Sequence, residues 1–175
     1  MLVWLLTFSV IMVFAGLTSA YIISKERKDW VSFNMPEIFF LSTALIIASS
    51  IFMILVMNSV KKNKILLAQI YMLIAIILGV AFCFTQKLGF YELHKQGIYA
   101  LGAGANIHAS FMLVLVYTHI GHLVLAIAGM FYTFYKLRKG AYSPADFHGL
   151  NLCSIFWHFM DGLWIYLFLF LYFIR

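Results

Sequence analysis

The segment Cys153–Tyr172, CSIFWHFMDGLWIYLFLFLY, decides the fold class of this chain. It is long enough to cross a hydrocarbon core of about 30 Å as one helix. Within it lie a single carboxylate, Asp161, and a single imidazole, His158. Ionisable groups at that depth are costly in lipid, so both should face protein. The segment therefore predicts a transmembrane helix packed against other helices.

Helical periodicity places the polar groups of this segment together. At about 100° per residue, Trp157, Asp161 and Trp164 fall on one side of the helix, and His158 flanks Asp161 one turn earlier. An acid, an imidazole and two indoles then share one stripe. We expect this stripe to face neighbouring helices.

The composition is that of an integral membrane protein. Of the 175 residues, 65% are hydrophobic and 10% are charged, against about 25% charged in soluble domains. The net charge of +6 comes from Lys and Arg in the gaps between apolar runs, so we predict no nucleic-acid partner. The uncharged run at residues 1–24 exceeds a signal-peptide core of about 7–15 residues and lacks a positively charged start, so we interpret it as a retained helix.

Five uncharged runs are long enough to span a bilayer: residues 2–24, 38–60, 65–85, 107–135 and 151–174. The sequence predicts one all-α domain, a polytopic membrane bundle of five transmembrane helices, with its ends on opposite sides. Lys and Arg number six on each side. Those on the N-terminal side are concentrated in short, nearly acid-free loops, which favours a cytoplasmic N-terminus.

Three histidines share one face of the fourth predicted helix. His108, His119 and His122 are separated by 11 and 3 residues, which places them within about 40° of one direction. Such imidazoles could hold haem iron, transfer protons, or bond a neighbouring helix. The two histidines of a haem-ligand pair lie at the same depth in the membrane, but His122 and His158 are expected at different depths. The expected depths of His122 and Asp161 agree to within about one helical turn. We therefore favour structural hydrogen bonds, and expect His122 to meet Asp161 or a tryptophan of the last helix, directly or through water.

These side chains predict an intramembrane polar network with a structural role, made by His119, His122, Trp157, His158, Asp161 and Trp164. The sequence contains no catalytic triad, phosphate-binding loop or four-ligand metal spacing, so we assign neither catalytic nor metal-binding residues. Aromatic and basic side chains near helix ends commonly anchor to lipid headgroups. The predicted lipid contacts are Trp4, Tyr21, Trp30 and Lys61.

The run Trp157-His158-Phe159 followed by Asp161 and Trp164 resembles the W-H-F-x-D-x-x-W signature near the C-terminus of subunit III of haem-copper cytochrome c and quinol oxidases. Other segments are similar to that family with less specificity. They are residues 8–17, the serines and threonine of 42–50, Gln86 with Tyr91, and the H-x-x-H of 119–122. The chain matches the five-helix bacterial form of the subunit.

The resemblance implies a noncatalytic subunit of a bacterial terminal oxidase, a complex that reduces O₂ to water and pumps protons. It implies packing on catalytic subunit I and on other oxidase subunits, binding of structural phospholipid, and haem and copper held by the partner subunits. It also implies a multi-pass protein of the bacterial inner membrane with a cytoplasmic N-terminus and a periplasmic C-terminus. Membership of a respiratory supercomplex stays open.

Two positions depart from the family pattern. Val10 stands where a glutamate is common, and Asn151 where an acid often precedes the signature histidine by seven residues. The resemblance therefore implies no proton route through either position. Two alternatives stay open: a quinol oxidase subunit III, and a small haem-binding membrane electron carrier using His119 or His122. A transporter is disfavoured, because the sequence lacks repeated halves or a broken helix pair.

Overall fold

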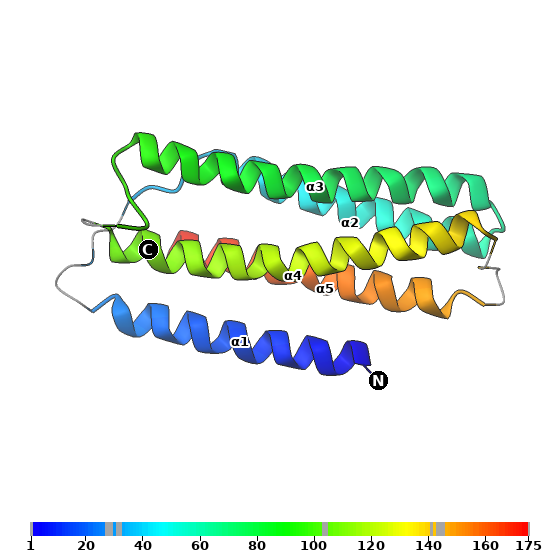
Figure 1. Cartoon of the computed structure of the whole chain (residues 1–175), viewed down its shortest axis with the longest axis horizontal. Helices are drawn as coiled ribbons and strands as arrows, with labels where there is room; N and C mark the ends of the chain where they lie inside the picture. Colours follow the sequence, from blue (N-terminus) through cyan, green and yellow to red (C-terminus); the bar gives the residue numbers. More distant parts are fainter. Residues whose placement is uncertain are drawn as a thin grey trace.

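The computed structural model describes residues 2–26, 30, 33–102, 105–140, 142 and 146–174, and helices dominate these ranges (Figure 1). The helices are α1 (Leu2–Ser24), α2 (Ile38–Lys61), α3 (Ile65–Lys95), α4 (Ile107–Arg138) and α5 (His148–Phe173). All five are long and apolar enough to cross a membrane. The described ranges contain no strand. The predicted all-α bundle of five transmembrane helices is confirmed.

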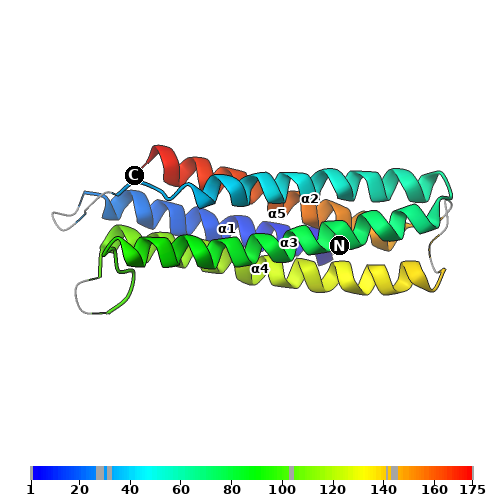
Figure 2. The same cartoon turned by 90° about the horizontal axis from the view of Figure 1, so that it is seen from above.

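Four of the helices form a closed ring, to which the first is added. α2 packs against α3, α3 against α4, α4 against α5, and α5 back against α2. α1 lies beside this ring, in contact with α4 and α5 (Figure 1). Figure 2 shows α2 and α5 along one edge of the molecule and α3 and α4 towards the opposite edge. The two ends of the chain lie at opposite ends of the bundle, as an odd number of spans requires (Figure 1).

Local backbone chemistry sets several helix boundaries. Asn63 adopts a left-handed conformation, with φ of 57°, in the short turn between α2 and α3. Gly97 and Gly140 do the same just beyond α3 and α4, with φ of 77° and 72°. At the start of α4, the Asn106 side chain accepts a hydrogen bond of 2.9 Å from the backbone N–H of His108. This bond satisfies an amide that the helix itself leaves unpaired.

The third helix is longer than the sequence predicts. α3 continues ten residues beyond the expected end at residue 85 because its last three turns are amphipathic. Gln86, Gly89 and Leu93 are buried on one face, while Lys87 and Glu92 are exposed on the other. With 31 residues, α3 measures about 46 Å and exceeds the hydrocarbon core. The first charged residue, Lys87, therefore does not mark the end of the helix. α4 ends three residues later than expected, and α5 begins three residues earlier.

Two tryptophans of α5 fill the centre of the ring. The Trp157 indole is fully buried and reaches Gly79 of α3. A Cβ added at Gly79 would lie 2.7 Å from Cη2 of Trp157, closer than carbon atoms approach. The Trp164 ring meets Phe82 of α3 edge to face, with centroids 4.9 Å apart. α5 thus contacts α3 across the ring through aromatic side chains.

Replacing Gly79 with alanine tests this central packing. Gly79→Ala is expected to lower the thermal stability of the solubilised protein, because the rigid buried indole cannot move aside, at a cost of about 1–3 kcal/mol. The temperature at which half of the protein leaves the monodisperse size-exclusion peak measures the effect. Gly121→Ala, on α4, is the matched control, because nothing lies within 4 Å of the carbon atom that this substitution adds. Equal losses in both variants would contradict the assignment of Trp157 to the close contact.

Candidate functional site

Asp161 lies within α5 and is enclosed by protein. Its side chain is 3% exposed. Neither carboxyl oxygen has a hydrogen-bond partner among the described residues. The hydroxyl of Ser50, on α2, approaches the carboxyl outside hydrogen-bond geometry. The acid therefore faces the bundle, but hydrogen bonds do not tie it to the neighbouring imidazoles.

Four hydroxyls on α2 make most of the side-chain hydrogen bonds to the neighbouring helices of the ring. Towards α5, Ser50 Oγ lies 2.6 Å from Nδ1 of His158, and Thr43 Oγ1 accepts a bond of 3.0 Å from Nε1 of Trp164. Towards α3, Ser42 Oγ accepts a bond of 2.9 Å from Nε2 of Gln86, and Ser49 donates one of 2.9 Å to the carbonyl of Ala75. Interhelical hydrogen bonds in membranes contribute about 0.6–2 kcal/mol each.

The spacing of these hydroxyls is regular. Ser42 and Ser49 are seven residues apart and face α3, while Thr43 and Ser50 are seven residues apart and face α5. Seven residues bring a helix back to nearly the same face after two turns. The small side chains Ser42, Ser49 and Ser50 predict a close-packing face on this helix, but not its hydrogen-bond partners. The pairs Ser42-Thr43 and Ser49-Ser50, seven residues apart, were the signal in the sequence that could have identified α2 as the hydrogen-bonding partner of α5.

His119 joins α4 to the backbone of α5. Its side chain is fully buried, and Nε2 donates to the carbonyl of Met160 at 3.2 Å. Because a carbonyl only accepts, the proton resides on Nε2. The ring lies 5.3 Å from the Trp164 ring, 6.0 Å from Phe82 and 6.4 Å from Phe14, measured between centroids. His119 is thus held within an aromatic cage.

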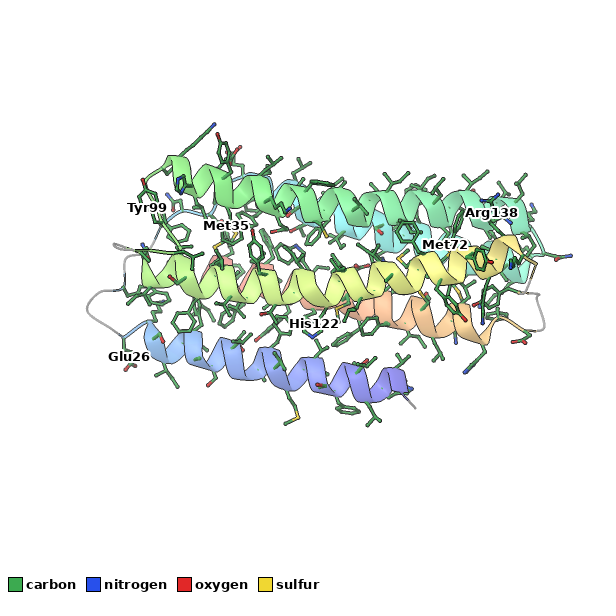
Figure 3. The ribbon with its side chains drawn as sticks, viewed as in Figure 1. Glu26, Met35, Met72, Tyr99, His122 and Arg138 are labelled. Carbon is green, nitrogen blue, oxygen red and sulfur yellow. The ribbon has the colours of Figure 1, made fainter. Side chains whose placement is uncertain are left out.

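The predicted meeting of His122 with Asp161 or a tryptophan of α5 is wrong. Nδ1 of His122 donates to the carbonyl of Thr118, four residues earlier in the same helix, at 2.8 Å. Its ring packs 5.9 Å from Phe14 of α1. Figure 3 shows the side chain pointing from α4 towards α1. Three residues beyond His119 turn the helix by about 300°, which brings His122 to the side that α1 occupies.

No direct hydrogen bond joins the six predicted polar residues to one another. His119, His122, His158 and Trp164 each bond a backbone carbonyl or an α2 hydroxyl. Nε1 of Trp157 is buried without a hydrogen-bond partner among the described residues. That these six residues act as one structural network stays a prediction. In the structure the partners are hydroxyls and carbonyls, which cost less to bury.

One of the four predicted lipid contacts needs correction. Tyr21 is fully buried, and its hydroxyl lies 2.8 Å from Nε2 of His108 on α4. Trp30 is half-buried and stacks on the His108 ring, with centroids 4.7 Å apart. Tyr21 therefore does not contact lipid as expected, whereas the lipid contact of the partly exposed Trp30 stays a prediction. Together the two side chains attach the end of α1 to the start of α4. Trp4 is 57% exposed and Lys61 is also exposed, so their lipid contacts stay predictions.

Loss of the Tyr21 hydroxyl should loosen this attachment. Tyr21→Phe keeps the ring packing but removes the bond to His108, at an expected cost of about 1 kcal/mol. Thermal unfolding in detergent measures this loss of stability, and hydrogen exchange at the C-terminal end of α1 should become faster. Tyr166→Phe, at a phenol 49% exposed on α5, is the control and should change neither. A Tyr21→Phe protein as stable as the parent would show that the hydrogen bond contributes nothing.

The histidines do not fit a haem site. Nε2 of His119 donates to a carbonyl, and its Nδ1 is enclosed among aromatic side chains, so neither nitrogen is open to a haem. His122 lines a cavity whose lining residues include no second histidine. Over the described ranges, no group of three or more His, Cys, Asp or Glu could hold a metal ion.

A cavity of about 440 Å³ lies between α1, α4 and α5. Its walls are mainly apolar, and Cys153 lies on one of them. Near one end of the bundle the lining changes to Lys136, Tyr132 and Tyr142, with Nζ of Lys136 4.9 Å from the centre of the Tyr132 ring. Burial raises the pKa of the Tyr142 phenol, so it stays neutral and can donate a hydrogen bond. The cavity combines a long apolar wall with one cation and two phenols.

These features define a polytopic membrane protein whose intramembrane polar groups join helices to one another. No protein-family model matches the chain. The chain is similar to cytochrome c oxidase subunit 3 of Alkalihalophilus pseudofirmus, with 28% identity over 162 residues, 91% of this chain and 75% of that protein. It is similar to cytochrome bo(3) ubiquinol oxidase subunit 3 of Buchnera aphidicola subsp. Acyrthosiphon pisum, with 28% identity over 174 residues, 97% of this chain and 83% of that protein.

A third relative is cytochrome c oxidase subunit 3 of Synechocystis sp., with 26% identity over 166 residues, 91% of this chain and 69% of that protein. Homologues of this chain are thus subunit 3 of both cytochrome c oxidases and bo(3) ubiquinol oxidases. The resemblance carried by residues 157–164 is confirmed. The homologues support a subunit III of a haem-copper oxidase and do not favour the haem-binding carrier.

Proposed function

We propose that this chain is the noncatalytic subunit III of a haem-copper terminal oxidase in a bacterial inner membrane. The observation that carries the proposal is the similarity to oxidase subunit 3 proteins over nine-tenths or more of the chain. The polar groups of the bundle agree with it, since most are engaged in helix pairing and none is arranged as a reacting centre. The relatives include both cytochrome c and ubiquinol oxidases, so either donor fits.

In this role the chain would pack on subunit I as its main contact, beside the other oxidase subunits. The partner subunits would hold haem and copper and carry the electrons. The N-terminus would lie in the cytoplasm. The short basic loops around residues 61–64 and 136–140 lie at the same end of the bundle as the N-terminus (Figure 1), and such loops favour the cytoplasmic side.

Co-purification tests the proposal. Tagged chain extracted in mild detergent should carry haem-containing polypeptides and oxygen-reducing activity with it. Separated from those polypeptides, the chain should lose the Soret absorption band, because the described residues contain no group of three or more potential metal ligands and the cavity beside His122 is lined by no second histidine. The reduced-minus-oxidised visible spectrum of both fractions measures this. Haem retained by the separated chain, or extraction without any haem-bearing partner, would refute the assignment.

Structural phospholipid is the second part of the proposal, in the cavity between α1, α4 and α5. The apolar wall suits an acyl chain. Lys136 lies in the last turn of α4, at the expected depth of a headgroup, and supplies a positive charge for the phosphate. The Tyr132 and Tyr142 phenols line the same end and can donate hydrogen bonds to it. This combination supports a phospholipid over a purely apolar occupant.

The thiol of Cys153 reports on the occupancy of this cavity. In a Cys83→Ser background, Cys153 is the sole thiol of the chain. Its labelling by a maleimide in the intact complex should rise several-fold after delipidation and fall again when phospholipid is restored. Mass spectrometry of this subunit measures the labelled fraction.

A headgroup variant sharpens this test. Lys136→Gln should raise labelling before delipidation, because the lipid loses its charged anchor. Arg138→Gln, on the same turn but outside the cavity lining, should not. If the labelled fraction of Cys153 did not change with lipid content, the cavity would hold no phospholipid.

A further inference from the structure

His158 presents a polar atom on the outer side of the α2 and α5 pair. The residue is only half-buried, unlike Trp157 and Asp161 beside it. Ser50, its partner, lies twelve residues from the start of α2 and eleven from its end. The pair is therefore about 16–18 Å from either end of that helix, close to the middle of the bilayer.

The second nitrogen of this imidazole lacks a partner within the chain. Nδ1 lies 2.6 Å from Ser50 Oγ. Nε2 makes no hydrogen bond with any described residue, and it is not among the enclosed polar atoms, so it reaches the surface. A neutral imidazole has one donor and one acceptor nitrogen, so Nε2 needs an outside acceptor in one tautomer and an outside donor in the other.

Lipid cannot supply that partner. Acyl chains have no hydrogen-bonding atoms, the headgroups lie about 15 Å away at this depth, and the hydrocarbon core contains no water. The other helices of the chain lie elsewhere, because α2 and α5 form one edge of the molecule with α3 and α4 towards the opposite edge (Figure 2). The Nε2 atom therefore requires a protein group from outside this chain.

The surface around His158 suits close approach by another helix. Gly162 follows His158 by one turn, is exposed, and has nothing within 4 Å of an added Cβ. Small residues let membrane helices approach closely, and polar side chains then bond across the contact. Apolar neighbours surround this point: Ile47 and Ile51 on α2 are 43% and 54% exposed, and Ile155 on α5 is 37% exposed.

We infer that this α2/α5 seam, made by Ile47, Ser50, Ile51, Ile155, His158 and Gly162, docks a transmembrane helix of the catalytic subunit. That helix supplies a hydrogen-bonding group to Nε2 of His158 at mid-membrane, from a hydroxyl, amide or carboxyl side chain or an unpaired carbonyl. The inference rests on the proposed function and adds to it the face through which the subunit is held. Asp161, buried behind Ser50, makes no contact with the partner.

Site-directed photo-cross-linking in the intact complex tests the docking face. A benzophenone amino acid at Ile51 or Ile155 should cross-link to a membrane helix of the haem-bearing subunit, identified by mass spectrometry. The same probe at Met12, which is 76% exposed on α1, is the control and should give lipid adducts. Seam probes that yield only lipid adducts, or only cross-links to a second copy of this chain, overturn the inference.

Substitution of His158 tests the hydrogen bond itself. His158→Phe keeps a ring of similar size, and is expected to speed loss of this subunit from the complex in detergent about three- to tenfold. His158→Gln keeps hydrogen-bonding atoms and should restore retention in part. Ser50→Ala removes only the bond inside the chain, so it should loosen the complex less than His158→Phe. Equal effects of His158→Phe and Ser50→Ala would show that His158 acts within the bundle alone.

These outcomes are separable from the test of the proposed function. A complex that carries haem but gives only lipid adducts at the seam removes the inference and leaves the oxidase assignment intact. Failure to recover any haem-bearing partner removes the assignment itself.

Discussion

The structure depends on one constraint: a polar group inside a bilayer is costly unless it finds a partner in protein. α2 meets this constraint for its neighbours with hydroxyls at two heptad positions. Ser42 and Ser49 bond α3, while Thr43 and Ser50 bond α5. Hydroxyls are inexpensive to bury and reach only a short distance, so they bring the helices close. The aromatic residues of α5 can then fill the centre of the ring, where Gly79 makes room for Trp157.

The same constraint relates the buried groups to function. His119 and Trp164 use their N–H groups to join helices, and the other nitrogen of His119, Nδ1, is buried within the bundle. His158 differs because one of its nitrogens is turned outward. A homologue of oxidase subunit 3 that holds no cofactor would act through its surfaces. Its two notable surfaces are the cavity beside α1 and the edge formed by α2 and α5.

Sequence periodicity predicted which residues of a helix face the bundle interior, but not which neighbouring helix they contact. The stripe of Trp157, Asp161 and Trp164 could be identified because helical geometry is local. The partner of His158 lies 108 residues earlier in the chain, and that of Tyr21 lies 87 residues later. No local rule selects between the helices that could oppose a face. The end of α3 was missed for a related reason, since Gln86 and Gly89, on either side of the first charged residue Lys87, pack against α2, which lies far away in the sequence.

The separate position of α1 has a consequence for biogenesis. Helices enter the membrane in chain order, and α1 is synthesised before any of its contacts exist. The ring of α2 to α5 closes through its own hydrogen bonds, whereas α1 gains its anchors only when α4 and α5 have been inserted. Of these five spans, the first in the chain thus waits longest for a partner. Until then it stays exposed to lipid along its whole length, a state that its uncharged sequence tolerates.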